Sequence, residues 1–284
     1  MRKIFVGLIV AVLFSSISCT SLMKGLTDSL YEQKDIVLVE EGAPAFLLLV
    51  EGLIKGNPQD KNMLQTGIQM FSSYGGAFVK DSERKKIFQD KTKYWALELL
   101  KTYPLYVMFD KEKDREKKDK LFQSFLKSLT KSDVPTVFWA CNAWIMWIIG
   151  NLDSTDAFLE LPLAKGIIDR IYVLDGDYYY GAPHLFYGVF YGAFPKDFGG
   201  NLEIAKKEFD IALKLSGDKL LITKLFYANF YLKPKNDKAG FEQIINEILE
   251  TDIDKYPETR LLNMVSKREA LDLKNRINEL FFDL

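Results

Sequence analysis

The chain has 284 residues, of which 48% are hydrophobic, 27% charged and 14% aromatic, a composition typical of globular proteins rather than disordered, collagenous or disulfide-scaffolded ones. A formal net charge of −1 gives no electrostatic basis for binding nucleic acid. The single histidine, His184, argues against zinc sites built from several histidines and against any two-histidine mechanism.

The N-terminal residues follow one another in the order typical of a secretory signal peptide. Arg2 and Lys3 precede an apolar run from Ile4 to Phe14, small residues at 15–18, and then Cys19. This order predicts a signal peptide over residues 1–18, and the apolar run is too short for a permanent transmembrane helix. The cysteine resembles that of a bacterial lipobox, where it is diacylated and becomes the new N-terminus. An ordinary cleaved signal, with Cys19 as a bystander, is the alternative.

We therefore expect a lipidated N-terminus and tether over residues 19–40 and a helical domain over residues 41–284. Without residues 1–18 the chain has 36 basic and 39 acidic residues, a net charge of −3. Cys141 is then the one cysteine besides Cys19, so a lipidated chain has no intramolecular disulfide to form. In its apolar segment Cys141 is predicted to be a small buried side chain.

Helical periodicity begins at about residue 24 and continues to the C-terminal region. Asn57-Pro58 predicts a helix N-cap followed by proline at the first helical position. Residues 110–120 are all charged, with mixed signs, and predict a solvated helix start or loop. The apolar stretch from Val134 to Ile149 is too short to span a bilayer and predicts a buried helix.

The second half of the chain is also predicted to be helical. Small and aromatic residues at Ala205, Phe209, Ala212 and Leu213 match the second helix of a tetratricopeptide repeat, with residues 184–194 as its partner. Gly217-Asp218 predicts a left-handed helix end and the next N-cap. A one-sided apolar stripe follows at Phe241, Ile244, Ile245, Ile248 and Leu249. The predicted fold is all-α: stacked helical hairpins forming irregular tetratricopeptide-like repeats.

Aromatic residues concentrate between Tyr178 and Tyr231. Most are expected in the core, but tyrosine hydroxyls need polar partners, which suits grooves and interfaces. His184 is most simply a helix-start residue, with a ligand-facing role as the alternative. The candidate ligand-binding or partner-binding residues are Tyr179, Tyr180, His184, Tyr187, Tyr191, Tyr227 and Tyr231.

Motifs of known chemistry do not occur in the sequence. There is no Walker loop, GxGxxG, GxSxG, HExxH or CxxC. Asp252-x-Asp254 lacks the glycine and the final glutamate of a calcium loop. We expect no catalytic residues, no metal site and no cofactor.

Several sequence blocks together resemble the TatT family, the lipoprotein component associated with certain tripartite ATP-independent periplasmic (TRAP) transporters. The resemblance depends on the order and spacing of these blocks over about 230 residues. They are EGLIKGNP from Glu51, NMLQTGIQMFSSYGGAFV from Asn62, FWACNAW from Phe138, LELPLAK from Leu159, GAPHLFYGVFYGAFPKDFGGNLEIAKKEFDIAL from Gly181, FEQIINEILETD from Phe241 and RLLNMVSKREALDL from Arg260.

The resemblance implies a periplasmic lipoprotein, anchored to a bacterial membrane through Cys19, with a tetratricopeptide-like helical fold and a homotrimeric state. It further implies docking of the transporter's solute-binding protein, a helical channel for a hydrophobic or organic-acid ligand, and no catalysis. Two alternatives stay open. One is a generic envelope scaffold lipoprotein without a solute role, and the other is an exported hydrolase whose paired carboxylates come from different helices.

Overall fold

The computed structural model describes residues 25, 27–151, 153–193 and 196–281, and within these ranges it contains helices and turns but no β-strand. The predicted all-α fold is confirmed. The predicted signal peptide over residues 1–18 and Cys19 lie outside the described residues. In the described part, no helix combines the length and the apolar character needed to cross a membrane.

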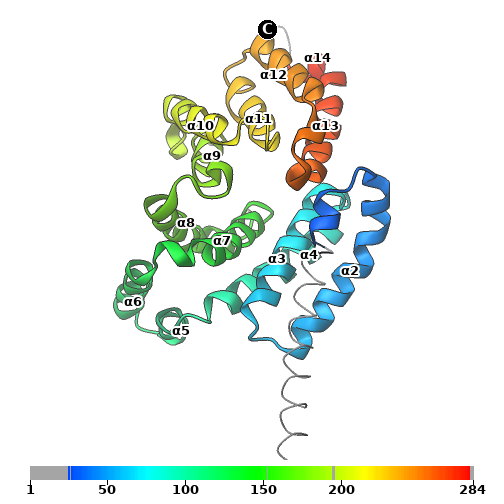
Figure 1. Ribbon diagram of the computed structural model, residues 1–284. Helices are drawn as coiled ribbons and strands as arrows, with labels where there is room; N and C mark the ends of the chain where they lie inside the picture. Colours follow the sequence, from blue (N-terminus) through cyan, green and yellow to red (C-terminus); the bar gives the residue numbers. More distant parts are fainter. Residues whose placement is uncertain (1–24, 26, 152, 194–195, 282–284) are drawn as a thin grey trace, which may run out of the picture. The chain divides into compact units, whose positions relative to one another are not determined.

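Helices follow one another along the described chain (Figure 1). Short 3-10 turns lie between some of them, at η1 (Lys131–Asp133), η2 (Lys196–Phe198), η4 (Ile253–Lys255) and η5 (Pro257–Thr259), and η3 (Ala228–Leu232) is π-helical. The α-helices are α2 (Ile36–Gly56), α3 (Lys61–Ala77), α4 (Ser82–Leu100), α5 (Pro104–Lys111), α6 (Arg115–Ser128), α7 (Val134–Ile149), α8 (Thr155–Asp175), α9 (Tyr178–Ala193), α10 (Leu202–Ser216), α11 (Ile222–Tyr227), α12 (Lys238–Glu250), α13 (Arg260–Asn275) and α14 (Ile277–Leu280).

Two compact units make up the chain. Unit 1 consists of the N-terminal segment up to Val39 together with Ser216–Leu284, and unit 2 consists of Glu40–Leu215. The boundary falls inside α2, so most of that helix belongs to unit 2. The helical domain predicted over residues 41–284 includes residues of both units.

Unit 2 is a stack of helical hairpins. α3 packs on α4, α5 on α6 and α7 on α8, and α4 also packs on α7. α2 contacts both α3 and α4. The hydroxyl of Tyr74 on α3 donates to the carbonyl of Glu40 on α2 at 3.0 Å, and the ammonium of Lys91 on α4 lies 2.7 Å from the Glu51 carboxylate of α2. The hairpin stack agrees with the sequence-based expectation, while the tetratricopeptide-like repeat itself stays a prediction.

The centre of unit 2 is α7, which has the bounds that the apolar stretch predicts, Val134–Ile149. Cys141 on this helix is fully buried, and its thiol donates to the Ala164 carbonyl of α8 at 3.2 Å. Burial raises the pKa of the thiol, since the thiolate loses its hydration. The prediction of a small buried cysteine is confirmed.

Two predicted helix boundaries are wrong. Asn57-Pro58 lies in the turn after α2, and the N-cap of α3 is Asp60, whose carboxylate accepts from the amides of Asn62 and Met63. Gly217 is left-handed, with φ +52°, as predicted, but α11 begins only at Ile222. In both places the chain turns before the next helix begins, and the cap follows that turn.

The predicted pairing of residues 184–194 with the following helix is present within unit 2. Ala205, Phe209 and Ala212 of α10 are fully buried. A Cβ atom on Gly188 of α9 would lie 2.9 Å from the Phe209 ring. The absence of a side chain at Gly188 therefore lets α9 approach the aromatic residue of α10.

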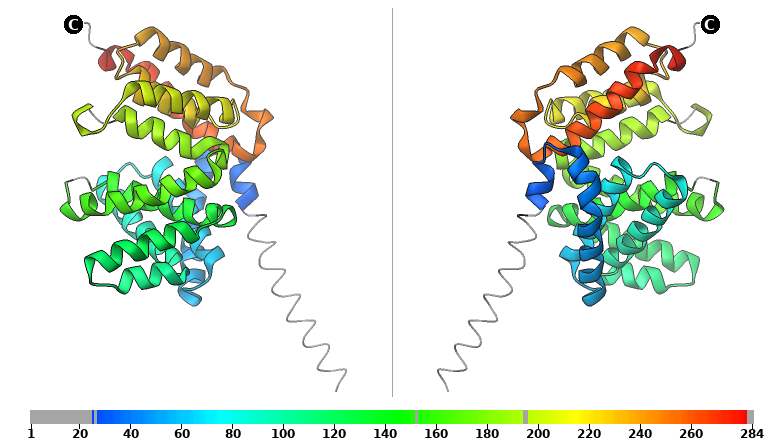
Figure 2. Two further views of the ribbon diagram at one scale, coloured as in Figure 1. Left: turned by 90° about the vertical axis from the view of Figure 1, so that its left-hand side faces the viewer. Right: turned by 90° about the vertical axis from the view of Figure 1, so that its right-hand side faces the viewer.

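Unit 1 is built on α11, α12 and α13, and Figure 2 shows α12 and α13 side by side. The predicted stripe of α12 faces inward, with Phe241, Ile245 and Ile248 buried. Buried Asn263 of α13 accepts from the amide of Leu221 at 2.9 Å and donates to the carbonyl of Lys219 at 3.1 Å. This amide satisfies the backbone of the turn that leads into α11.

Candidate functional site

The candidate residues of the aromatic region belong to two groups. Five of them lie on α9 in unit 2: Tyr179, Tyr180, His184, Tyr187 and Tyr191. The other two, Tyr227 and Tyr231, lie at the end of α11 and in η3 of unit 1. Each group is described within its own unit.

The α9 group begins with a sharp turn of the backbone. Tyr179, Tyr180 and Gly181 are left-handed, with φ of 46°, 59° and 80°. A left-handed conformation costs a bulky residue about 1–2 kcal/mol, so packing must hold the two tyrosines there. Tyr179 lies 5.2 Å from Trp139 and 6.2 Å from Phe138, between ring centroids. The aromatic rings of α7 thus hold the turn that redirects the chain into α9.

His184 forms part of a polar network that joins three helices. Its Nδ1 lies 2.7 Å from Oε2 of Glu208 on α10, and the hydroxyl of Tyr172 on α8 donates to Oε1 at 3.2 Å. The rings of Tyr172 and His184 meet edge to face at 4.8 Å. Burial, followed by the charge of Glu208, raises the pKa of Tyr172. His184 is 8% exposed, and buried polar groups require such partners.

Tyr187 points toward a second carboxylate. Its hydroxyl donates to Asp169 of α8, which also accepts from the Lys165 ammonium at 2.8 Å. Tyr187 is 8% exposed, and burial followed by the hydrogen bond to Asp169 raises the pKa of its phenol. Tyr191 stacks on Tyr187 at 6.1 Å and is only partly buried. Of these two rings, Tyr191 therefore has the more accessible surface.

The unit 1 group is a stacked pair of rings. Tyr227 and Tyr231 lie 5.2 Å apart at an interplanar angle of 14°, and the Lys235 ammonium is 5.7 Å from the Tyr231 centroid. Their spacing of four residues places them on one face where the helix widens into η3. π-Helical turns frequently occur at functional positions. Tyr231 is 9% exposed, whereas Tyr227 is partly buried.

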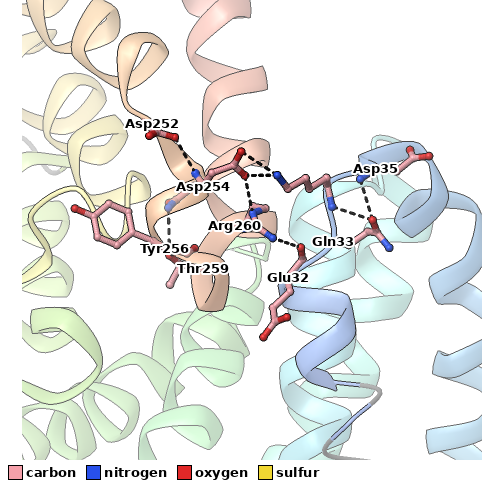
Figure 3. A network of polar contacts seen from close by, with 10 residues as sticks. Glu32, Gln33, Asp35, Asp252, Asp254, Tyr256, Thr259 and Arg260 are labelled. Carbon is pink, nitrogen blue, oxygen red and sulfur yellow. Dashed lines mark hydrogen bonds and ion pairs between the residues drawn. The ribbon is translucent and has the colours of Figure 1, made fainter.

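A polar clasp in unit 1 holds the segment that leads from the N-terminus (Figure 3). Lys34 lies 2.8 Å from Asp254, and Nε of Arg260 lies 3.1 Å from the same carboxylate. Arg260 also donates to the Glu32 carbonyl at 2.6 Å. The hydrogen bond from Lys34 and the charge of Arg260 lower the pKa of the Asp254 carboxyl. The clasp fixes the end of the predicted tether to the folded unit.

Sequence reasoning did not identify Asp169, Glu208 and Asp254 as partners of the candidate tyrosines, of His184 or of the N-terminal segment. Helical spacing would have suggested the pair of Asp169 with Lys165, but Tyr187, His184 and Lys34 each lie on a different segment from the carboxylate that they contact. Their oxygens are engaged by tyrosine, histidine, lysine or arginine side chains, an arrangement that supports the helices. Among the described residues, no group of three metal-ligating side chains is brought together.

Comparisons with known proteins identify a family for most of the chain. A family model described as "TRAP transporter T-component" matches residues 32–281. A protein of Treponema pallidum (strain Nichols), which carries the name "Uncharacterized protein", is 23% identical over 279 residues, covering 89% of this chain and 82% of that protein. The family match includes the clasp residues from Glu32 and both groups of aromatic residues.

Proposed function

Because the chain belongs to the TRAP transporter T-component family, we propose that it docks the solute-binding protein of a tripartite ATP-independent periplasmic transporter. The observation that carries the proposal is the family match over residues 32–281, which extends over both compact units. The proposed role is to position this partner within the transporter. The proposal also includes a hydrophobic or organic-acid ligand that the chain carries and a homotrimeric state.

Anchoring at the periplasmic side of a bacterial membrane is part of the same proposal. The N-terminal order of basic, apolar and small residues before Cys19 supports lipidation there, and several acyl chains on one residue give stable attachment. Sixteen residues separate Cys19 from Ile36, where α2 begins. The clasp at Lys34 and Asp254 would hold the folded protein close to its anchor.

The accessible tyrosines are the proposed contact residues. Tyr191 and Tyr227 are partly buried and stack on buried rings, so each combines a fixed position with some exposed surface. Such rigid aromatic side chains commonly carry a large share of binding energy at interfaces. Tyr187 and Tyr231, which are less exposed, would support them from within the fold.

Isothermal titration calorimetry with the solute-binding protein of the same transporter tests the proposal. Tyr191→Ala and Tyr227→Ala should weaken binding by about 2 kcal/mol or more while leaving the melting temperature nearly unchanged. Tyr187→Ala should instead lower the melting temperature, because it leaves a cavity and removes the hydrogen bond from the phenol to Asp169. The absence of binding by the unmodified chain at tens of micromolar would overturn the transporter role and leave the envelope scaffold in its place.

A further inference from the structure

The hairpin of α7 and α8 in unit 2 ends in exposed apolar side chains (Figure 1). Phe158 and Leu159 at the start of α8 are 66% and 68% exposed, and Met146 and Ile149 at the end of α7 are also exposed. A short turn joins the two helices, so these side chains belong to one end of the hairpin. We call residues 146–151 and 153–159 the hairpin tip. Single exposed apolar residues are common, whereas a concentration of them marks an interaction surface.

Polar contacts hold the hairpin tip in place behind its exposed side chains. The amide of buried Asn151 donates to the Trp147 carbonyl at 2.8 Å, and the Gln89 amide of α4 donates to the Met146 carbonyl at 3.1 Å. The indole of Trp147 donates to the Asp90 carboxylate of α4 at 2.6 Å. A surface fixed in this way loses little conformational entropy when a partner binds.

The hairpin tip itself carries only negative charge. Residues 132–164 contain no lysine or arginine. Asp153 and Asp156 are exposed, and no ion pair among the described residues includes either of them. Glu160, just after the tip, is instead paired with Lys93 of α4 at 2.8 Å. The exposed apolar side chains are therefore accompanied by two carboxylates that are open to a cationic partner.

These charges favour one kind of occupant. Anionic phospholipid head groups would be repelled by Asp153 and Asp156, and a second copy that presented its own tip would bring like charges together. A protein with lysine or arginine around an apolar contact would form ion pairs at the rim while it covered Phe158 and Leu159.

We propose that the hairpin tip is a docking surface for a protein partner of this chemistry, an apolar contact surrounded by cationic side chains. In the proposed function that partner is the solute-binding protein, so the inference rests on the proposed function. It adds a defined surface of unit 2 to the contact residues Tyr191 and Tyr227. Phe158 and Leu159 are the apolar anchors of this surface, and Asp153 and Asp156 belong to its rim.

Isothermal titration calorimetry of the full chain with the solute-binding protein tests the apolar anchors. The double variant Phe158→Ala/Leu159→Ala should weaken binding about tenfold or more and leave the melting temperature nearly unchanged, because both side chains are exposed. Val173→Ala is the matched control, since Val173 is 74% exposed on the same helix but lies outside the tip. Unchanged binding by the double variant, or an equal loss with Val173→Ala, would overturn the inference.

Association kinetics at two salt concentrations test the rim charges. Asp153→Asn/Asp156→Asn should lower the association rate about threefold or more at about 50 mM salt and have little effect at about 500 mM, where ions screen the attraction. The matched control is Asp119→Asn/Glu203→Gln, which removes two exposed carboxylates of α6 and α10 in the same unit. An equal decrease in the control, or faster association of the tip variant, would overturn the inference.

Other occupants of the hairpin tip give distinct results. Sedimentation with phosphatidylglycerol vesicles that is lost in Phe158→Ala would assign the tip to a membrane and overturn the inference. Self-association that is lost in Phe158→Ala would assign it to a second copy, with the same consequence. Failure of the unmodified chain to bind the solute-binding protein would overturn the docking role together with the tip, whereas binding that survives in the tip variants would overturn the tip alone.

Discussion

Replacing Gly188 with alanine tests the close approach of α9 and α10 in unit 2. The added Cβ atom would lie 2.9 Å from Cγ and Cδ1 of Phe209 and 3.0 Å from its Cδ2. Carbon atoms prefer separations of about 3.5–4.0 Å. Because Phe209 is fully buried and its Cγ is attached directly to Cβ, the ring cannot rotate out of the contact. The two helices must move apart.

The magnitude of the effect follows from two opposing contributions. Overpacking of a core by one carbon costs about 1–3 kcal/mol, and a contact with three ring atoms belongs in the upper part of that range. Alanine recovers about 1 kcal/mol over glycine as a helix former. The net destabilisation of about 1–2 kcal/mol should lower the melting temperature of unit 2 by roughly 2–8 °C.

Thermal unfolding followed by far-UV circular dichroism measures this shift. Gly52→Ala is the matched control, because a Cβ at Gly52 of α2 meets no atom within 4 Å, and it should stabilise by up to about 1 kcal/mol. Phe209→Ala alone should cost about 3–5 kcal/mol, and in that background Gly188→Ala should become neutral or stabilising. An unchanged melting temperature for Gly188→Ala, with no dependence on Phe209, would refute the packing described here.

Three further predictions concern the N-terminal clasp, the buried thiol and the anchor. The lowered pKa of Asp254 means that its contribution to stability is complete above the carboxyl pKa of the unfolded chain, about 4, and is lost as the pH falls through the folded value. Melting curves of Asp254→Asn should therefore lack that part of the acid dependence, and an identical acid limb would contradict the ion pair. Cys141 should resist thiol reagents until denaturant is added, because burial raises its pKa and blocks access; rapid labelling of the native protein would argue against this. Cys19→Ala should move the protein from the detergent phase to the aqueous phase on phase partitioning, and equal partitioning of both forms would remove the lipid anchor.

The sequence by itself determined the features that depend on near neighbours along the chain. The all-α class, the bounds of α7, the inward stripe of α12 and the burial of Cys141 follow from hydrophobic periodicity, which is read within a few helical turns. The family resemblance also came from the sequence, because it depends on ordered blocks along the chain. The sequence did not determine every helix end. Either Asn or Asp can cap a helix, and α3 is capped by Asp60 rather than by the predicted Asn57.

The tertiary structure alone decided which polar groups of distant segments meet. Glu208 lies 24 residues from His184, and Asp254 lies 220 residues from Lys34. Hydrogen bonds and ion pairs act over a few ångströms in space, so no periodicity in the chain identifies such partners. The left-handed turn at Tyr179 is decided in the same way, because the rings of α7 offset a conformation that the local sequence disfavours.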